Sequence, residues 1–132
     1  MVNNAIYGMT GGQMAPTTLE GMETTTSPTG RDINTTGAPM DFPSIIANIP
    51  GAVYVASVSV DSPKNIAKAK KAIKKAFKVQ MAGLGFAFVS VLSTCPTNWG
   101  MTPSDSLKWL RQNMMPIYKM GELKVTEEVE KL

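Results

Sequence analysis

The order of strand and helix patterns most constrains the fold of this chain. Residues 52–60 are β-branched and alternate in polarity, and residues 85–92 form a nearly continuous apolar run, typical of a strand covered on both faces. The segment between them, which begins at Asp61-Ser62-Pro63 and ends near Gly83, has helical spacing. Two strands separated by one helix predict a parallel pair with a crossover, and hence an α/β fold.

Two shorter helices flank this unit. The first is expected over 41–49, with Asp41 as its N-cap and Pro50-Gly51 as its stop. The second is expected to run from Thr102 to about Met114, with Leu107 and Leu110 facing inward, and Pro116 ends it.

The predicted organisation is one partial domain. Residues 1–41 form a polar segment with a long loop, 42–115 the αβ layer, and 116–132 a short charged C-terminal tail. Two or three strands are too few for a complete doubly wound sheet, so we expect a three-layer parallel-sheet domain that lacks its N-terminal half.

Lysine is concentrated in one predicted helix. Seven lysines lie there with no acid between them, and subtracting them from the net charge of +3 leaves −4 for the rest. Nucleic-acid binding is one interpretation, but no aromatic residues are interleaved to stack on bases. We expect a surface helix with the lysines in solvent, whose inward positions are Ile66, Ala69, Ile73, Ala76, Phe77 and Gln80.

Composition excludes several classes of function. Hydrophobic residues make up 43% of the chain, too many for a disordered protein, and no apolar run approaches the ~20 residues of a membrane span. The absence of histidine excludes imidazole metal sites and Ser–His or Cys–His catalysis, and one cysteine cannot form an internal disulfide. The first residues lack the pattern of a secretory signal, so the expected location is the cytoplasm.

Residues 8–41 follow neither period and are rich in Gly, Thr, Pro and Met. This is well beyond the usual ~12–15 residues of a structureless connection, so the segment is either disordered or functional. A packed, ligand-covering loop is favoured by the apolar residues spread through it, which are Met9, Met14, Leu19, Met22, Ile33 and Met40.

Two polar, glycine-bearing segments, 3–13 and 93–100, are candidates for the carboxyl ends of strands, where open α/β sheets bind ligands. An Asn side-chain oxygen and a nearby backbone carbonyl suit Mg²⁺, and Thr10-Gly11-Gly12 can bring amides and a hydroxyl to a phosphate. On spacing alone, a simple turn is the commoner interpretation. Cys95, taken alone, is more typical of a buried structural thiol.

The two segments together resemble a known family. YGMTGGQ and CPTNWG, with NNAI before the first, TTTSPTGRD, and the helix KAKKAIKKAF, are similar to β subunits of 2-oxoacid:ferredoxin oxidoreductases, most like the 2-oxoglutarate and branched-chain types. The resemblance implies the C-terminal half of a thiamine diphosphate-binding domain. It also implies oxidative decarboxylation of a 2-oxoacid to an acyl-CoA, with an α subunit and ferredoxin as partners. From the residues alone, neither nucleic acid nor a membrane is expected as a partner.

The resemblance also assigns residues. It implies that Asn4 and the Ile6 carbonyl bind Mg²⁺, and that Thr10, Gly11 and Gly12 lie near the diphosphate of the cofactor. Cys95 matches the isolated last thiolate of a 4Fe–4S cluster in relatives that carry one.

The chain departs from the family in two ways. It contains no Gly-Asp-Gly, whose Asp is another Mg²⁺ ligand, and no second cysteine. We therefore expect an oxidoreductase subunit that is truncated or split and inactive alone. The alternative is a non-catalytic remnant, or assembly module, that binds a partner subunit.

Overall fold

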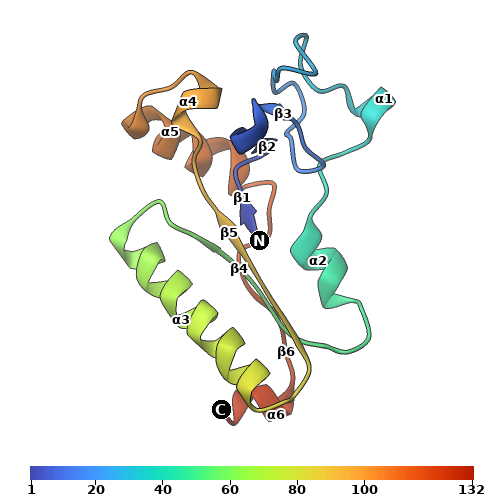
Figure 1. Ribbon diagram of the computed structural model, residues 1–132, viewed down its shortest axis with the longest axis vertical. Coiled ribbons are helices and arrows are strands. Elements are labelled where there is room, and N and C mark those ends of the chain that lie inside the picture. The colour runs from blue at the N-terminus through green and yellow to red at the C-terminus, as the bar shows by residue number, and fades with distance from the viewer.

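The computed structural model describes all 132 residues and has a mixed α/β architecture (Figure 1). Its main sheet has the strand order β1-β5-β4-β6. The first three strands of that order are mutually parallel, which confirms the predicted parallel pair of β4 and β5, and β6 runs antiparallel to β4. The bounds are β1 Val2–Asn3, β4 Ala52–Ser59, β5 Phe86–Leu92 and β6 Gly121–Val125.

The main sheet lies between two helices (Figure 1). Helix α3 (Pro63–Met81) joins β4 to β5 along one face, and its N-cap Ser62 accepts a hydrogen bond from the Asn65 amide. Helix α2 (Phe42–Ala47) lies on the other side. Both helices confirm the sequence prediction, although the Asp41 side chain at the start of α2 accepts from the Ser44 hydroxyl and makes no bond to a backbone amide.

The remaining elements are short. The predicted last helix is present but changes from α5 to the π-helical turn η2 at Leu110. No helix is both long enough and apolar enough to span a membrane. The bounds are β2 Ile6–Tyr7, η1 Gly8–Thr10, β3 Gln13–Met14, α1 Ile33–Thr36, α4 Pro96–Trp99, α5 Pro103–Trp109, η2 Leu110–Met114 and α6 Glu127–Glu130.

Two separate hydrophobic clusters hold the chain together. The first packs α3 on β4 and consists of Tyr54, Ala56, Val58, Ala69, Ala72, Val79 and Val129. The second joins the end of β5 to the long loop and to η2, and consists of Ala5, Leu19, Leu92, Leu110, Met114 and Tyr118. Because Leu19 belongs to the second cluster, the long loop is packed, as expected, although Met9 is fully exposed.

The predicted inward face of α3 is partly wrong. Ala69, Ala72 and Val79 are buried, whereas Ile66, Ile73 and Phe77 are exposed. The helix turns its small residues toward β4, and nothing in this chain covers the larger ones. For the same reason β5 is not covered on both faces, since Phe86 at its start is half exposed.

The C-terminal segment differs from the expected tail. Strand β6 pairs with β4, with Tyr54 opposite Val125, and Val129 is buried in the first cluster. A strand at the edge of a sheet often carries charged residues, here Glu122 and Lys124, and these obscure its alternation in the sequence.

Candidate functional site

The two polar segments follow adjacent parallel strands and meet at one edge of the sheet. Asn3 of β1 is in register with Leu92 of β5, and the Ser93 amide donates to the Asn3 carbonyl at 2.9 Å. Residues 4–13 and 93–100 then leave the sheet at the same end (Figure 1). Both segments therefore lie at the carboxyl ends of strands, as predicted.

Side chains of residues 93–100 hold the backbone of residues 3–13 by hydrogen bonds. The Asn98 amide donates to the Gly8 carbonyl at 2.8 Å, and Trp99 Nε1 donates to the Asn4 carbonyl at 3.2 Å. Trp99 also packs on Trp109, with ring centroids 4.6 Å apart, against the second hydrophobic cluster. These contacts fix the position of the Asn3–Gly8 turn, and both tryptophans are packing residues.

The turn that carries Asn4 is conformationally strained. Ala5, which is fully buried, has φ 62°, the only positive φ outside glycine. This conformation costs about 1–2 kcal/mol for a residue with a Cβ. Asn3 Oδ1 stabilises the turn by accepting the Ala5 amide at 3.0 Å, whereas Asn4 Oδ1 makes only a long contact of 3.4 Å with the Ile6 amide. The Asn4 oxygen is thus weakly held.

Gly8 lies next to three residues of the site, Asn4, Cys95 and Asn98. A Cβ at this position would lie 2.9 Å from Cys95 Sγ and 3.0 Å from Asn4 Nδ2, so a side chain is excluded by close approach. Gly12 has φ 79°, and a Cβ there would lie 3.1 Å from Asn98 Oδ1. The glycines therefore let Asn4, Cys95 and Asn98 lie close together.

The predicted diphosphate-binding turn is internally hydrogen-bonded. Thr10 Oγ1 bonds Gln13 Oε1 at 2.7 Å, and Gln13 Nε2 donates to the Thr10 carbonyl at 2.7 Å. The Gly12 amide donates to the Tyr7 carbonyl at 2.9 Å. Thr10 and Gly11 are exposed. A phosphate on this turn would have to replace these bonds.

The donor set fits a Mg²⁺ ion only in part. Asn4 Oδ1 and the Ile6 carbonyl are neutral oxygens of the kind that Mg²⁺ accepts, but protein Mg²⁺ sites usually include one or two carboxylates. The structure has no group of three His, Cys, Asp or Glu residues that could hold a metal. Cys95 is a free, half-buried thiol beside the Asn98 amide at 3.3 Å. Any carboxylate ligand and any further thiolates would therefore come from residues outside this sequence.

Arg31 stabilises the long loop, a role that was not predicted from the sequence. Its side chain is buried, pairs with no carboxylate, and makes six hydrogen bonds to backbone carbonyls. The sequence offers one signal, because Arg31 is the only basic residue before Lys64. The acceptors are Ala15 (3.1 Å), Pro16 (2.9 Å), Thr18 (2.8 Å), Thr36 (3.2 Å), Gly37 (3.0 Å) and Ala38 (3.2 Å).

Tyr118 attaches the loop to the segment after η2. Its buried hydroxyl donates to the Thr17 carbonyl, and burial raises the pKa of Tyr118 to about 12. The Thr18 hydroxyl in turn donates to the carbonyl of the strained Ala5 at 2.5 Å. The loop therefore supports the turn that carries Asn4.

An ion pair between Asp61 and Arg111 lies just after the end of β4. Arg111 Nε donates to Asp61 Oδ2 at 2.7 Å, and Arg111 Nη2 donates to the Asp61 carbonyl at 2.6 Å. Burial acts to raise the pKa of Asp61, but hydrogen bonds from Arg111, Asn65 and Ser59, and the Arg111 charge, lower it below its usual value. This pair was not predicted, and it anchors η2 beside the strand ends.

The sequence of this chain is similar to known proteins. Residues 1–91 match the family described as thiamine pyrophosphate enzyme, C-terminal TPP binding domain. Ketoisovalerate oxidoreductase subunit VorA of Methanothermobacter thermautotrophicus is 47% identical over 113 residues, covering 86% of this chain and 24% of the relative. The 2-oxoglutarate synthase subunit KorB of Methanocaldococcus jannaschii is 38% identical over 132 residues, covering 96% of this chain and 44% of the relative.

A solved structure shows the same fold. It is the 2-oxoglutarate:ferredoxin oxidoreductase from Magnetococcus marinus with 2-oxoglutarate, coenzyme A and succinyl-CoA bound, which matches with a TM-score of 0.66 and 26% identity. The match covers 96% of this chain and 46% of that one, so the chain spans less than half the length of the relatives described here. The chain belongs to the thiamine pyrophosphate enzyme C-terminal domain family, and its relatives are subunits of 2-oxoacid:ferredoxin oxidoreductases.

Proposed function

We propose that this chain is a component of a thiamine diphosphate-dependent 2-oxoacid:ferredoxin oxidoreductase and holds the Mg²⁺-diphosphate end of the cofactor. The observation that carries the proposal is the pair of contacts from Asn98 to Gly8 and from Trp99 to Asn4, at the carboxyl ends of two parallel strands. They join the two motif segments into one preorganised site, where α/β sheets bind ligands.

In this proposal Asn4 Oδ1 exchanges its long contact with the Ile6 amide for the metal, and the Ile6 carbonyl is the second ligand. Thr10, Gly11 and Gly12 contact the diphosphate, with Thr10 giving up its bond to Gln13. The bound cofactor supplies the carbanion chemistry of decarboxylation. The residues of this chain orient its charged end, and the long loop, which packs behind the site through Leu19 and Thr18, keeps the turn in place.

In this proposal, residues outside this sequence complete the active site. A carboxylate must complete the Mg²⁺ site, and three further thiolates must join Cys95 if a 4Fe–4S cluster forms. An α subunit, ferredoxin, a 2-oxoacid and coenzyme A are the partners and substrates that the relatives' reaction requires. We propose that the chain is inactive without them.

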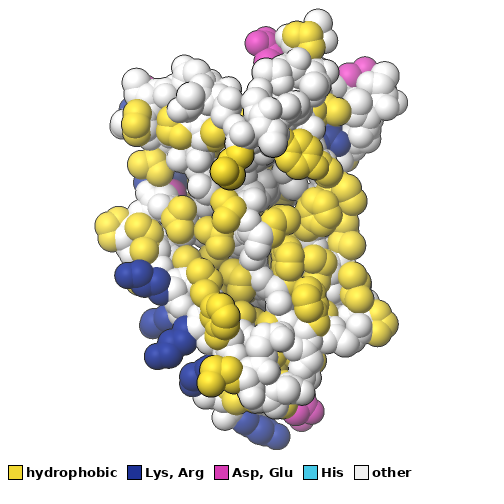
Figure 2. Space-filling model, in the orientation of Figure 1, with side chains coloured by type: hydrophobic (Ala, Val, Ile, Leu, Met, Phe, Trp, Pro, Cys, Tyr) yellow, Lys and Arg dark blue, Asp and Glu magenta, His cyan; other side chains and the backbone are white.

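A second candidate function is that of an assembly module, and the free edge of β5 favours it. Strand β1 pairs only with Val91 and Leu92 of β5. Figure 2 shows hydrophobic side chains gathered between α3 and α2 over this edge, and the exposed ones include Val2, Ile73, Phe77 and Phe86. An apolar surface on both sides of an open edge is suited to a polypeptide that adds a strand and helices.

Co-purification and activity together distinguish the two candidates. The chain is co-expressed with the part of M. jannaschii KorB that it does not match, and with the α subunit of the same M. jannaschii oxidoreductase. A stable complex that reduces viologen in the presence of a 2-oxoacid and coenzyme A supports the enzyme component. A stable complex without such reduction favours the assembly module, and the absence of any complex contradicts both.

A further inference from the structure

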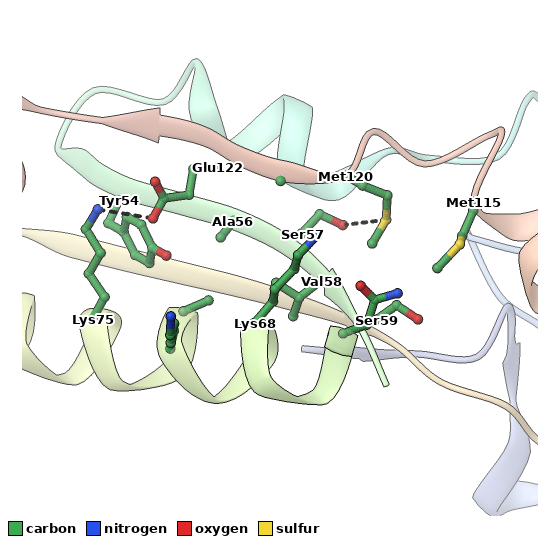
Figure 3. Close-up of a pocket in the computed structure, with 14 residues that line it drawn as sticks. Tyr54, Ala56, Ser57, Val58, Ser59, Lys68, Lys75, Met115, Met120 and Glu122 are labelled. Carbon is green, nitrogen blue, oxygen red and sulfur yellow. Dashed lines mark hydrogen bonds and ion pairs between the residues drawn. The ribbon is translucent and has the colours of Figure 1, made fainter. Parts of the chain in front are cut away.

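A cavity lies between α3 and strands β4 and β6, and it shares no residue with the candidate cofactor site (Figure 3). Its volume is about 570 Å³, within the usual range of small-molecule sites. The space exists because the residues that face one another are small. Ala56 of β4, Ala72 of α3 and Gly121 of β6 leave a hollow that larger side chains would fill.

The cavity wall is positively charged. Lys68, Lys71 and Lys75 all line it from α3, and Glu122 is the only carboxylate, so the lining has a net charge of +2. Lys75 pairs with Glu122 at 3.1 Å and lies 5.1 Å from the centre of the Tyr54 ring. Lys68 and Lys71 form no ion pair. Figure 3 shows Lys68 reaching from α3 toward Ser57.

The floor of the cavity combines apolar groups with an unused hydroxyl. Tyr54, Ala56 and Val58 point from β4 toward α3 and form the apolar part. Tyr54 is completely buried, and its hydroxyl has no hydrogen-bond partner. Burial, and after it the nearby Glu122 carboxylate, raise the pKa of Tyr54, so the hydroxyl is neutral, and it is closed off from solvent.

We propose that this cavity binds a small phosphorylated ligand of about mononucleotide size. Its phosphate lies between Lys68 and Lys71, and its apolar body rests on Ala56, Val58 and Ala72. Lysine binds phosphate as a point charge, and the charge of a phosphate group, about −2 at neutral pH, matches the two lysines that form no ion pair. A concave site of this volume also suits a small molecule better than the acidic surface of a protein.

The test uses the whole chain with ADP as the probe, in calorimetric titrations at fixed ionic strength without Mg²⁺ or thiamine diphosphate. The result is therefore independent of the proposed cofactor site. The double variant Lys68→Gln, Lys71→Gln is compared with Lys70→Gln, Lys74→Gln, which removes the same charge from the same helix outside the cavity. We expect the first to weaken ADP binding at least tenfold and the second less than twofold.

Two further measurements separate a cavity ligand from general attraction to lysines. Met120, which lines the cavity and is partly exposed, is replaced by Trp to fill the space, and we expect binding to be lost with no change in folding. ADP is expected to bind at least tenfold more tightly than inorganic phosphate. The proposal is overturned if ADP does not bind at millimolar concentration, if inorganic phosphate binds equally well, or if the two double variants weaken binding equally.

Discussion

Asn98 donates its side-chain amide to the Gly8 carbonyl at 2.8 Å, across 90 residues of sequence. This bond joins the loop after β5 to the turn after β1. The same Asn98 amide also lies against Cys95 Sγ. Strand pairing brings the two segments to one edge of the sheet, and this bond then fixes the Gly8 backbone against the second segment.

Replacing Asn98 by Ala is expected to loosen the turn. Loss of one hydrogen bond should lower the free energy of unfolding by about 1 kcal/mol. In the assembled complex it should weaken thiamine diphosphate binding roughly tenfold, which corresponds to ~1.4 kcal/mol. Asn48→Ala is the control, because Asn48 makes a similar 2.8 Å bond to the Ser44 carbonyl far from the site. Equal effects of both variants on cofactor binding would argue against a role for Asn98.

Replacing Gly8 by Ala is expected to force Cys95 and Asn4 apart, since the new Cβ would lie 2.9 Å from Cys95 Sγ. Overpacking of this kind costs about 1–3 kcal/mol, measurable by urea denaturation. The double variant Gly8→Ala, Cys95→Ala should recover part of the loss because the sulfur is removed. Additive effects in this cycle would show that the contact between Gly8 and Cys95 is not close in solution.

Arg31→Lys is expected to open the long loop. A lysine has three donors from one atom and cannot reach six carbonyls on both arms of the loop. We expect a loss of about 3 kcal/mol in the free energy of unfolding, because buried acceptors lose charged donors. Hydrogen exchange should become faster at the amides of Thr18 and Gly37. Unchanged protection there, with Lys119→Ala as the exposed control, would contradict this role.

The Asp61–Arg111 pair predicts a pH dependence of stability. The pKa of Asp61 is lower in the folded chain than its usual value of 3.8, so folding favours the ionised form. Its contribution is fully present above pH 3.8 and is lost as the pH falls through the lower folded pKa. Asp61→Asn should cost about 2 kcal/mol at pH 7. The difference from the unsubstituted chain should shrink below about pH 4, and a difference that is constant with pH would contradict the assignment.

Much of the fold was predictable because its signals are local. Strands β4 and β5 and helices α2 and α3 follow from periodicity and caps, and both polar segments occur at strand ends, as expected. Strand β6 was not recognised, since an edge strand has no full apolar face and its partner is distant in sequence. The exposed Ile73 and Phe77 were assigned inward because helical spacing reveals an apolar stripe but not which chain covers it.

The site itself was only partly predictable. Asn4, Ile6, Thr10, Gly11, Gly12 and Cys95 remain predicted ligands. Of these, the structure places Asn4 and Cys95 beside Gly8, and Gly12 beside Asn98. Arg31 and the strained Ala5 were missed, because their roles depend on backbone carbonyls and a φ angle that no residue pattern encodes.

The central claim, that Asn4 binds the metal of a Mg²⁺-diphosphate group, is tested most directly by calorimetric titration of the assembled complex with thiamine diphosphate at varied Mg²⁺ concentration. The account predicts Mg²⁺-dependent binding that Asn4→Ala weakens at least tenfold, while Asn48→Ala leaves it unchanged. Binding that is independent of Mg²⁺, or equal in Asn4→Ala and the unsubstituted chain, would contradict it.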